Sequence, residues 1–545
     1  MTAPARRMAG PLLLSALLLH LVLVQPNHPA AATWGALAVF PLELPVILLG
    51  LMALGTGRAG TVLRALLVAA LVTIAVLKAA DFAAFTALSR GFNPVADLPL
   101  VDASVRLLAG TVGGPAAAGI VAAALGVIAL LAAGLWWATG VWARVRLPRP
   151  AAMAAGLGAV LAAGVATAEV AEALRRWTPP VALPGAAFTA RIGVERAEMV
   201  TRTLTELRQF REAARQDPFA GVPGLLDAID RDVIVVFVES YGRTSHDTPL
   251  FAELHRETLA RGEARLGELG LATRSGFVTA PTRGGQSWLS HATLANGLWI
   301  DDQTRYGAAL ASGRETLFHI AGRSGFRTAA VMPAITLEWP ESARMGFDTV
   351  LAAKDLGYRG EPFNWVTMPD QFTLAALDRL LRTGAHDAPL FAQVALVSSH
   401  APWVPVPELL DWDALGDGTV FNAVATSGDP PEVVWRDRDR VRAQYRLSVD
   451  YALATVLDYA ARHAGDPPLL VVLGDHQAAG FVALDDRPDV PVHLIGPADL
   501  VERAADWGFT PGLLPEATGP LRPMAELRDL FIRTFSSDAD GGDAS

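Results

Sequence analysis

Acidic and histidine side chains directly follow three apolar segments in the second half of the chain. They are Glu239, His400, Asp475 and His476. In an open parallel α/β sheet, ligand sites form where the carboxyl ends of the strands meet at one edge. Carboxylate oxygens and imidazole nitrogens are natural ligands for zinc or manganese. Each residue alone is more often a turn or loop residue, but equivalent positions after three strands predict a metal site.

A serine nucleophile is predicted within the stretch APTRGGQSWLSHATLANGLW, residues 280–299. The glycine pair in RGGQ allows a close turn of the backbone, and the residues from Ser287 to Gly297 are typical of a short helix. Ser287 would then lie at the helix N-terminus, where backbone N–H groups favour an anion. A serine at this place is also a common N-cap, so helix capping is the structural alternative.

The elements that carry these residues predict an α/β domain with a mainly parallel central sheet, because strand-like and helix-like segments alternate from about Leu226 onward. The expected strands are Val233–Val238, Arg327–Met332, Leu390–Val397, Leu469–Leu473 and Val490–Ile495. The expected helices are Pro249–Leu269, Pro369–Arg382 and Asp439–His463.

The first third of the chain has a different composition. The 545 residues are 52% hydrophobic and 18% charged, and the long Ala/Leu/Val/Gly runs are concentrated before about Leu174. Five runs are long and apolar enough to span a bilayer, which takes about 20 residues. The five expected transmembrane helices are Met8–Gln25, Trp34–Leu54, Ala65–Phe82, Pro115–Val141 and Ala151–Ala171.

Positive charge near these spans is concentrated on one side of the membrane. The arginines of that side are Arg6, Arg7, Arg58, Arg64, Arg144, Arg146 and Arg149. The positive-inside rule places the N-terminus in the cytoplasm and everything after Ala171 outside. The Arg6-Arg7 pair and the sequence PAAAT at Pro29–Thr33 also suit a cleaved signal peptide. Cleavage would leave the C-terminal part outside as well.

The division into domains follows from these patterns. Residues 1–174 are the predicted transmembrane helices, 175–225 an extracytoplasmic linker with a helix at Val194–Gln216, 226–535 the catalytic domain and 536–545 a disordered acidic tail. A net charge of −10 argues against nucleic acid as a partner. The absence of cysteine excludes disulfides, thiol nucleophiles and thiolate metal sites.

These motifs resemble the alkaline phosphatase/sulfatase superfamily, and within it the membrane-anchored lipoteichoic acid synthase and phosphoglycerol transferase group. The resemblance extends over the N-terminal helices, the helical linker and the α/β domain. It implies one divalent metal ion, with manganese expected and magnesium or zinc as alternatives. The implied ligands are Glu239 in VFVESYG, Ser287 in GGQSWLS in place of the family's threonine, and Asp475 and His476 in LGDHQ.

The resemblance also implies contacts to the substrate. His400 in SSHAPW matches the family's phosphate-binding histidine, and Trp339 in EWPESARMGFD matches a substrate-binding tryptophan. The arginine that the synthases have two residues after this tryptophan is Glu341 here, with Arg344 as a substitute. His291, one helical turn beyond Ser287, is a further candidate for the pocket wall.

The expected function is transfer of a phosphoglycerol-type group from a membrane lipid to an extracytoplasmic glycan or glycolipid, through a covalent Ser287 intermediate. A phosphoethanolamine transferase or a phosphate or sulfate ester hydrolase is the alternative within the superfamily. Formylglycine formation is not expected, because Ser287 lacks the x-Pro-x-Arg sequence after it. An alternative of another class is a non-catalytic binding module. The expected location is the inner or plasma membrane, with multiple spans and an extracytoplasmic catalytic domain.

Overall fold

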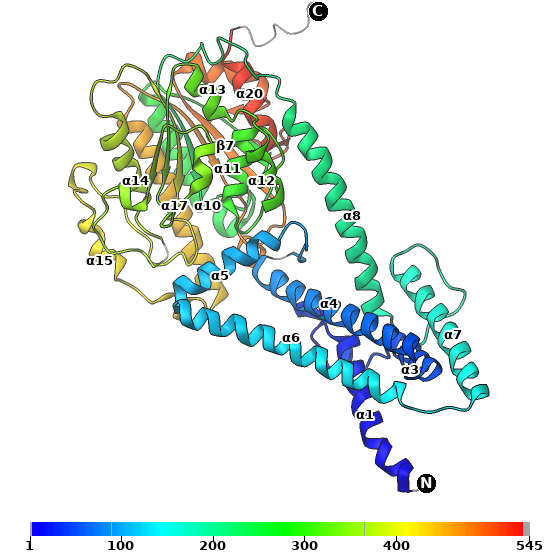
Figure 1. Cartoon of the computed structure of the whole chain (residues 1–545). Coiled ribbons are helices and arrows are strands. Elements are labelled where there is room, and N and C mark those ends of the chain that lie inside the picture. The colour runs from blue at the N-terminus through cyan, green and yellow to red at the C-terminus, as the bar shows by residue number, and fades with distance from the viewer. Residues whose placement is uncertain (1–2, 89, 365, 538–545) are drawn as a thin grey trace, which may run out of the picture. The chain divides into compact units, whose positions relative to one another are not determined.

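The computed structural model describes residues 3–88, 90–364 and 366–537 (Figure 1). The chain folds into two compact units, Met1–Arg208 and Gln209–Ser545. Most of the predicted acidic tail, residues 538–545, lies outside the described residues. The finer domain boundaries expected at residues 174, 225 and 535 stay predictions.

The first unit is helical and contains the apolar segments. Three helices are long and apolar enough to cross a membrane, namely α4 (Arg58–Leu88), α6 (Gly114–Ala143) and α7 (Arg149–Ala173). α1 (Ala3–Val24), in its apolar part Ala9–Val24, and α3 (Glu43–Leu54) are shorter apolar helices. The expectation of about five apolar helices is therefore confirmed, and the chain is a membrane-anchored protein.

The second expected span, Trp34–Leu54, is broken into two helices. A short helix α2 (Trp34–Leu37) is separated from α3, and Pro41 between them forms a β-bridge with Ala186. Pro41 has no backbone N–H with which to continue a helix, whereas Pro45 lies in the first turn of α3, where none is needed. The structure also has a helix that was not predicted, α5 (Leu98–Val112).

A buried ion pair connects α4 to α8 (Phe188–Arg215) within the helical unit. The Asp81 carboxylate is fully buried and pairs with the Arg196 guanidinium. Asp81 also accepts a hydrogen bond from the Phe92 backbone N–H at 2.9 Å, and Arg196 donates to the Phe92 carbonyl. Charged groups in apolar surroundings are costly unless they are paired, so this pair holds the start of α8 against α4.

Two further charged side chains serve the same attachment. Lys78, fully buried, donates to the Thr189 hydroxyl at 2.7 Å and to the Leu23 carbonyl at 3.0 Å. Glu43 accepts a hydrogen bond from the Ala190 backbone N–H at 2.9 Å. The first turn of α8 has N–H groups without intrahelical partners, and Glu43 satisfies one of them.

The second unit is built around one mixed sheet. Its strand order is β4-β3-β5-β1-β6-β7-β2-β8, and β9 pairs with β2. The strands from β4 to β6 run parallel to their neighbours, whereas β7 is antiparallel to β6 and β2 is antiparallel to β7. The strands are β1 (Val233–Val238), β2 (Ala272–Thr279), β3 (Arg327–Met332), β4 (Thr349–Ala352), β5 (Leu390–Leu396), β6 (Leu469–Gly474), β7 (Asp489–Gly496), β8 (Thr510–Pro511) and β9 (Arg522–Pro523).

Helices cover both faces of this sheet (Figure 1). On one face, the core contains residues of α10 (Pro249–Glu268), α14 (Asp370–Leu377) and α17 (Arg438–Arg462). On the other, it contains residues of α11 (Ser287–Asn296), α13 (Leu317–Arg323) and α20 (Leu527–Thr534). All six residues of β1 are buried, alternately on the two faces. A central parallel strand covered on both sides reads as a continuous apolar run, as β1 does.

The expected mainly parallel α/β domain is confirmed. The five predicted strands are present, and the predicted helix Pro369–Arg382 is α14 continued by a π-helical turn at Asp378–Arg382. β2 was not predicted because its buried face includes polar residues. Arg274 of β2, for example, is buried and donates to the Phe509 carbonyl and to Glu502. Only tertiary partners make such a side chain acceptable in a core.

We predict that Asp81→Asn destabilises the protein by about 3 kcal/mol, because it leaves the Arg196 guanidinium buried without its counter-charge. The measurement is thermal or denaturant unfolding of the purified chain in detergent. Asp102→Asn is the control, since its pair with Arg106 is largely exposed, and we expect a change within about 0.5 kcal/mol. Equal effects of the two substitutions would contradict the assigned role of the Asp81–Arg196 pair.

Candidate active site

The predicted metal ligands lie at the carboxyl ends of adjacent parallel strands. β1 lies between β5 and β6, and Val238 pairs in register with Leu396 of β5 and with Gly474 of β6. The chain therefore leaves the three strands at one edge of the sheet. Glu239, Asp475 and His476 each offer one ligand atom there, and these atoms all lie within 4.8 Å of one another.

Hydrogen bonds from Ser240 and His476 orient the two carboxylates. Asp475 Oδ1 accepts from the N–H groups of Ser240 at 2.8 Å and of His476 at 2.7 Å. Glu239 Oε1 accepts from the Ser240 hydroxyl at 3.0 Å. Ser240 has a φ of 56°, a conformation that is uncommon for residues other than glycine. The hydrogen bond to Asp475 Oδ1 holds Ser240 in this conformation. The second carboxylate oxygen, Asp475 Oδ2, takes no part in these two backbone contacts.

The electrostatics of the three residues are coupled. Burial and the neighbouring Glu239 carboxylate raise the pKa of Asp475 to about 7. Burial alone would raise the pKa of Glu239 as well, but His476 and His400 hold it well below its usual range. Burial alone would lower the pKa of His476, yet the Asp475 and Glu239 carboxylates raise it to about 9. The pair of buried carboxylates thus requires a positive partner, which protonated His476 supplies without a metal.

The donor set fits one divalent cation. His476 Nε2 is buried 3.2 Å from Glu239 Oε1 and 3.7 Å from Asp475 Oδ2, yet it makes no hydrogen bond of acceptable geometry. Two carboxylates and one imidazole whose ligand atoms lie within 4.8 Å of one another suit zinc, manganese or magnesium. Because metal binding displaces a proton from imidazole, such an ion would replace the charge of protonated His476.

Ser287 lies beside this group from the other layer of the fold. It is the first residue of α11, and the N-cap is Gln286, which has a left-handed φ of 67° and no side-chain capping hydrogen bond. The Ser287 hydroxyl instead donates to Glu239 Oε2 at 3.1 Å. Ser287 is therefore not the helix cap. The turn before it approaches the strand end closely, since the Gly284 N–H donates to the Gln477 carbonyl at 2.7 Å.

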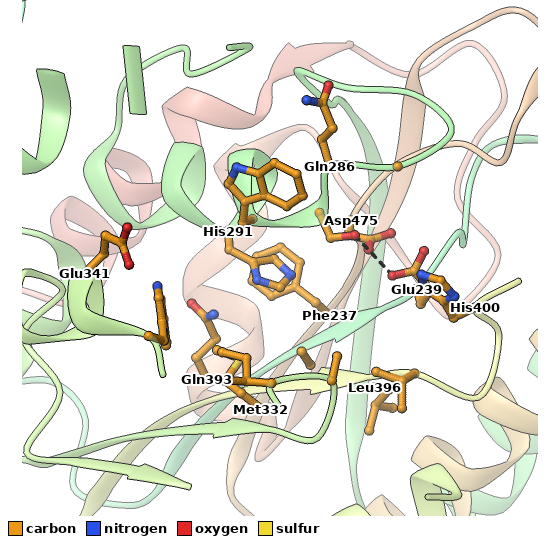
Figure 2. A pocket seen from close by; sticks show the side chains of 18 of the residues that line it. Phe237, Glu239, Gln286, His291, Met332, Glu341, Gln393, Leu396, His400 and Asp475 are labelled. Atoms are coloured by element: carbon orange, nitrogen blue, oxygen red, sulfur yellow. Dashed lines mark hydrogen bonds between the residues drawn. The ribbon is translucent and has the colours of Figure 1, made fainter. Parts of the chain in front are cut away.

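A cavity of about 450 Å³ opens next to the nucleophile candidate, and its close-up shows how the labelled side chains face it (Figure 2). Its lining includes Glu239, Ser287, His291, Trp339 and His400. His291 packs on Phe237 with a ring centroid distance of 4.1 Å. His400 Nδ1 lies 2.6 Å from the Ala401 carbonyl, so that its other ring nitrogen remains for a ligand.

Arg344 is the predicted substrate contact that is not among the described lining residues of the cavity. It is exposed at the end of the 3-10 helix η2 (Pro340–Arg344). Glu341, in the first turn of η2, lines the cavity instead. A contact between Arg344 and a substrate stays a prediction.

Several lining residues were missed from the sequence. Gln393 had a visible signal, because it is a polar residue inside the apolar strand segment LFAQVALV. Tyr306, Met332 and Trp288 carried no such signal, since aromatic and apolar residues at these spacings are typical of helix and strand cores. Only the folding of α11, α12 (Gln303–Ala311) and β3 around one space brings them together.

Residues 231–488 match the sequence model of the sulfatase family. These residues form a sulfatase-family domain. The matched range begins just before β1 and contains every residue predicted here for the site. The match of this domain indicates an enzyme that acts on phosphodiester or sulfate esters. None of the curated proteins matches the chain significantly.

Solved structures with related domains are similar at low sequence identity. LtaP, a lipoteichoic acid synthase from Listeria monocytogenes, is 13% identical over 53% of this chain and 71% of that chain, with a TM-score of 0.34. The periplasmic domain of the phosphoethanolamine transferase EptC from Campylobacter jejuni is 11% identical over 57% and 94%, with a TM-score of 0.36. The phosphoglycerol transferase GacH from Streptococcus pyogenes is 12% identical over 62% and 93%, with a TM-score of 0.35. These TM-scores are too low to argue from, so the family assignment rests on the sequence match.

We predict that Glu239→Gln weakens manganese binding by at least about a hundredfold while the fold is kept, because one anionic ligand is lost. The measurement is a calorimetric titration with Mn²⁺ alongside thermal unfolding. Asp370→Asn is the control, because Asp370 is a buried carboxylate at the same sheet edge that accepts from the Val397 and Ser398 N–H groups. It should lose stability and keep its metal. Unchanged manganese affinity in Glu239→Gln would remove Glu239 from the ligand set.

Proposed function

We propose that this protein is a membrane-anchored, metal-dependent phosphotransferase that moves a phosphodiester headgroup from a lipid through a covalent Ser287 intermediate. The observation that carries the proposal is the position of the Ser287 hydroxyl. Ser287 Oγ lies 3.1 Å from Oε2 of Glu239, which forms a candidate metal site with Asp475 and His476. Ser287 also lines the cavity. A serine that is needed only for helix capping would not contact this carboxylate.

Glu239, Asp475 and His476, joined by Ser287 Oγ, would hold one divalent cation, manganese or else magnesium or zinc, which when bound lowers the pKa of the serine hydroxyl and stabilises anionic charge. Ser287 is the first residue of α11, and the backbone N–H groups at a helix start favour a negatively charged phosphate. The site thus combines a nucleophile with two sources of positive potential.

In the first step, Ser287 Oγ attacks the phosphorus as the alkoxide, the form in which the second step releases it, a new O–P bond forms, and the bond from phosphorus to the lipid alcohol breaks. His400 supplies the proton to the leaving alcohol. Its Nδ1 hydrogen bonds to the Ala401 carbonyl, which leaves Nε2 as the proton-transferring atom. In the second step, an acceptor hydroxyl gives its proton to His400 and attacks the phosphoserine, and Ser287 is released.

Sequence patterns support a lipid donor and an extracytoplasmic acceptor. Among the described residues, three membrane-capable helices precede the catalytic domain, and the arginine distribution favours a multi-pass topology with that domain outside. A glycan or glycolipid hydroxyl is the proposed acceptor. The sequence resemblance proposes a phosphoglycerol-type headgroup, with phosphoethanolamine as the alternative, and the charge of the cavity bears on this choice.

Two other activities are less well supported. A formylglycine sulfatase would need the x-Pro-x-Arg sequence after the nucleophile, and Trp288-Leu289-Ser290-His291 stands there. A non-catalytic binding module would have no use for a serine hydroxyl directed at a buried carboxylate. Hydrolysis with water as the acceptor uses the same first step, and it differs only in what resolves the intermediate.

We predict that Ser287→Ala lowers phosphodiester turnover by at least about a thousandfold, because it removes the proposed nucleophile. The measurement is release of diacylglycerol from labelled lipid vesicles, with mass spectrometry of the peptide that contains residue 287. The wild-type protein should show a phosphorylated headgroup adduct on Ser287.

Ser290→Ala is the matched control for that experiment. Ser290 is a buried serine of the same helix that contacts the Thr282 hydroxyl, and it is not among the described lining residues. Turnover should stay within about threefold of the wild type, as expected for a structural serine. Turnover by Ser287→Ala equal to that of Ser290→Ala would exclude the covalent mechanism.

A further inference from the structure

The cavity next to Ser287 has acidic residues at both ends. Glu239 and Asp475 lie at one end and Glu341 at the other, with His291, Gln393 and Met332 labelled between them (Figure 2). Glu239 and Asp475 are the metal ligands proposed above. Among the described lining residues there is no lysine or arginine. Glu341 itself is exposed to solvent, so a cationic group of a bound ligand would form an exposed charge pair with it.

Aromatic side chains of two tryptophans and one tyrosine line the cavity together with Glu341, and Tyr306 is close enough to interact with its carboxylate. Trp339 precedes η2 and is half-buried, Tyr306 of α12 is 5% exposed, and Trp288 of α11 lines the same space. Burial and the nearby Glu341 carboxylate raise the pKa of Tyr306, so the phenol stays neutral. The Trp288 indole N–H donates to Gln303 at 3.0 Å. Faces of tryptophan and tyrosine attract cations.

The floor of the cavity carries polar atoms without protein partners. Gln393 in the middle of β5 is 1% exposed, and both its amide oxygen and its amide nitrogen lack a hydrogen-bond partner. The Nε2 atom of His291 is also buried without a partner. Buried polar groups are almost always hydrogen-bonded, so these three atoms are positioned for a ligand with polar groups or for the water that it displaces.

We propose that the Glu341 end of this cavity binds an ammonium group, so that the headgroup transferred to Ser287 is an amine-bearing phosphodiester of the ethanolamine or choline type. The inference rests on the proposed phosphotransferase function and names its substrate class. A carboxylate with aromatic walls is the arrangement that recognises ammonium ions. Gln393 and His291 complete the contacts to the phosphate-bearing chain.

A glycerol headgroup fits this end less well. Its hydroxyls would hydrogen bond to Gln393, but a headgroup without an ammonium group would form no charge pair with the exposed Glu341 carboxylate. The arginine at the matching place in the synthases is replaced by Glu341, and Arg344 is not among the described lining residues. An additional anionic group on the substrate would be repelled by Glu341.

The test is calorimetric binding of three soluble headgroups to the manganese-loaded full-length protein in detergent. The headgroups are phosphoethanolamine, phosphocholine and sn-glycerol phosphate. We expect at least one of the two amine-bearing compounds to bind about fivefold more tightly than glycerol phosphate, the ratio for one exposed charge pair of about 1 kcal/mol. Comparing the two amines distinguishes a primary from a methylated ammonium group.

Variants of the acidic end assign the effect to one residue. Glu341→Gln should reduce the preference for the amine about fivefold, and Glu341→Arg should reverse it. Glu338→Gln is the matched control, since Glu338 is an exposed acid of the same segment and is not among the described lining residues. It should keep the preference of the wild type.

Tighter binding of glycerol phosphate, no difference among the three compounds, or equal effects of Glu341→Gln and Glu338→Gln would overturn the inference. Binding is measured without turnover, so the result is separate from the Ser287 experiment. An amine preference without any Ser287 adduct would refute the proposed transferase and keep the binding site. An adduct that carries glycerol would support the proposed transferase and refute the ammonium-binding site.

Discussion

The arrangement of the site depends on two buried carboxylates that approach each other at the end of a parallel sheet. Glu239 and Asp475 are each less than a tenth exposed, and they lie close enough to share one ligand position. Like charges at this separation are tolerated in a protein interior only with a positive partner. His476 provides it when protonated, and a divalent cation provides it more strongly. The surrounding structure holds these groups in place against their mutual repulsion.

Both layers of the domain contribute to that constraint. From α17, the Tyr445 hydroxyl donates to the Ser240 carbonyl at 2.9 Å, and from the end of β5 the Ser399 hydroxyl donates to the Glu239 carbonyl at 2.6 Å. Ser287 approaches from α11 on the opposite face. The strand end is thus fixed from one layer, while the proposed nucleophile comes from the other. A serine placed in this way has little freedom to move away from the carboxylate.

In the helical unit too, charged side chains that are buried in apolar surroundings have polar or charged partners. Lys78 and Asp81 are fully buried in α4, and both are paired with residues of α8. In a membrane-spanning helix such residues commonly mark a transport pathway or a functional site. Here their partners belong to the segment that leads to the catalytic domain, so the charges serve attachment. Anchor and active site therefore both depend on paired buried charge.

The sequence by itself determined the apolar helices, the mainly parallel α/β domain and the candidate ligands Glu239, Asp475 and His476, because strand ends and hydrophobic periodicity are local properties. It did not reveal β2, whose buried Arg274 depends on distant partners, or the break at Pro41 in the second span. Only the tertiary structure decided that Glu341 faces the cavity, that Arg344 is not among its described lining residues, and that Gln393 lies unpaired on its floor. Chemistry-bearing residues can be found from their position along a strand, but the shape and charge of a pocket depend on segments that meet only after folding.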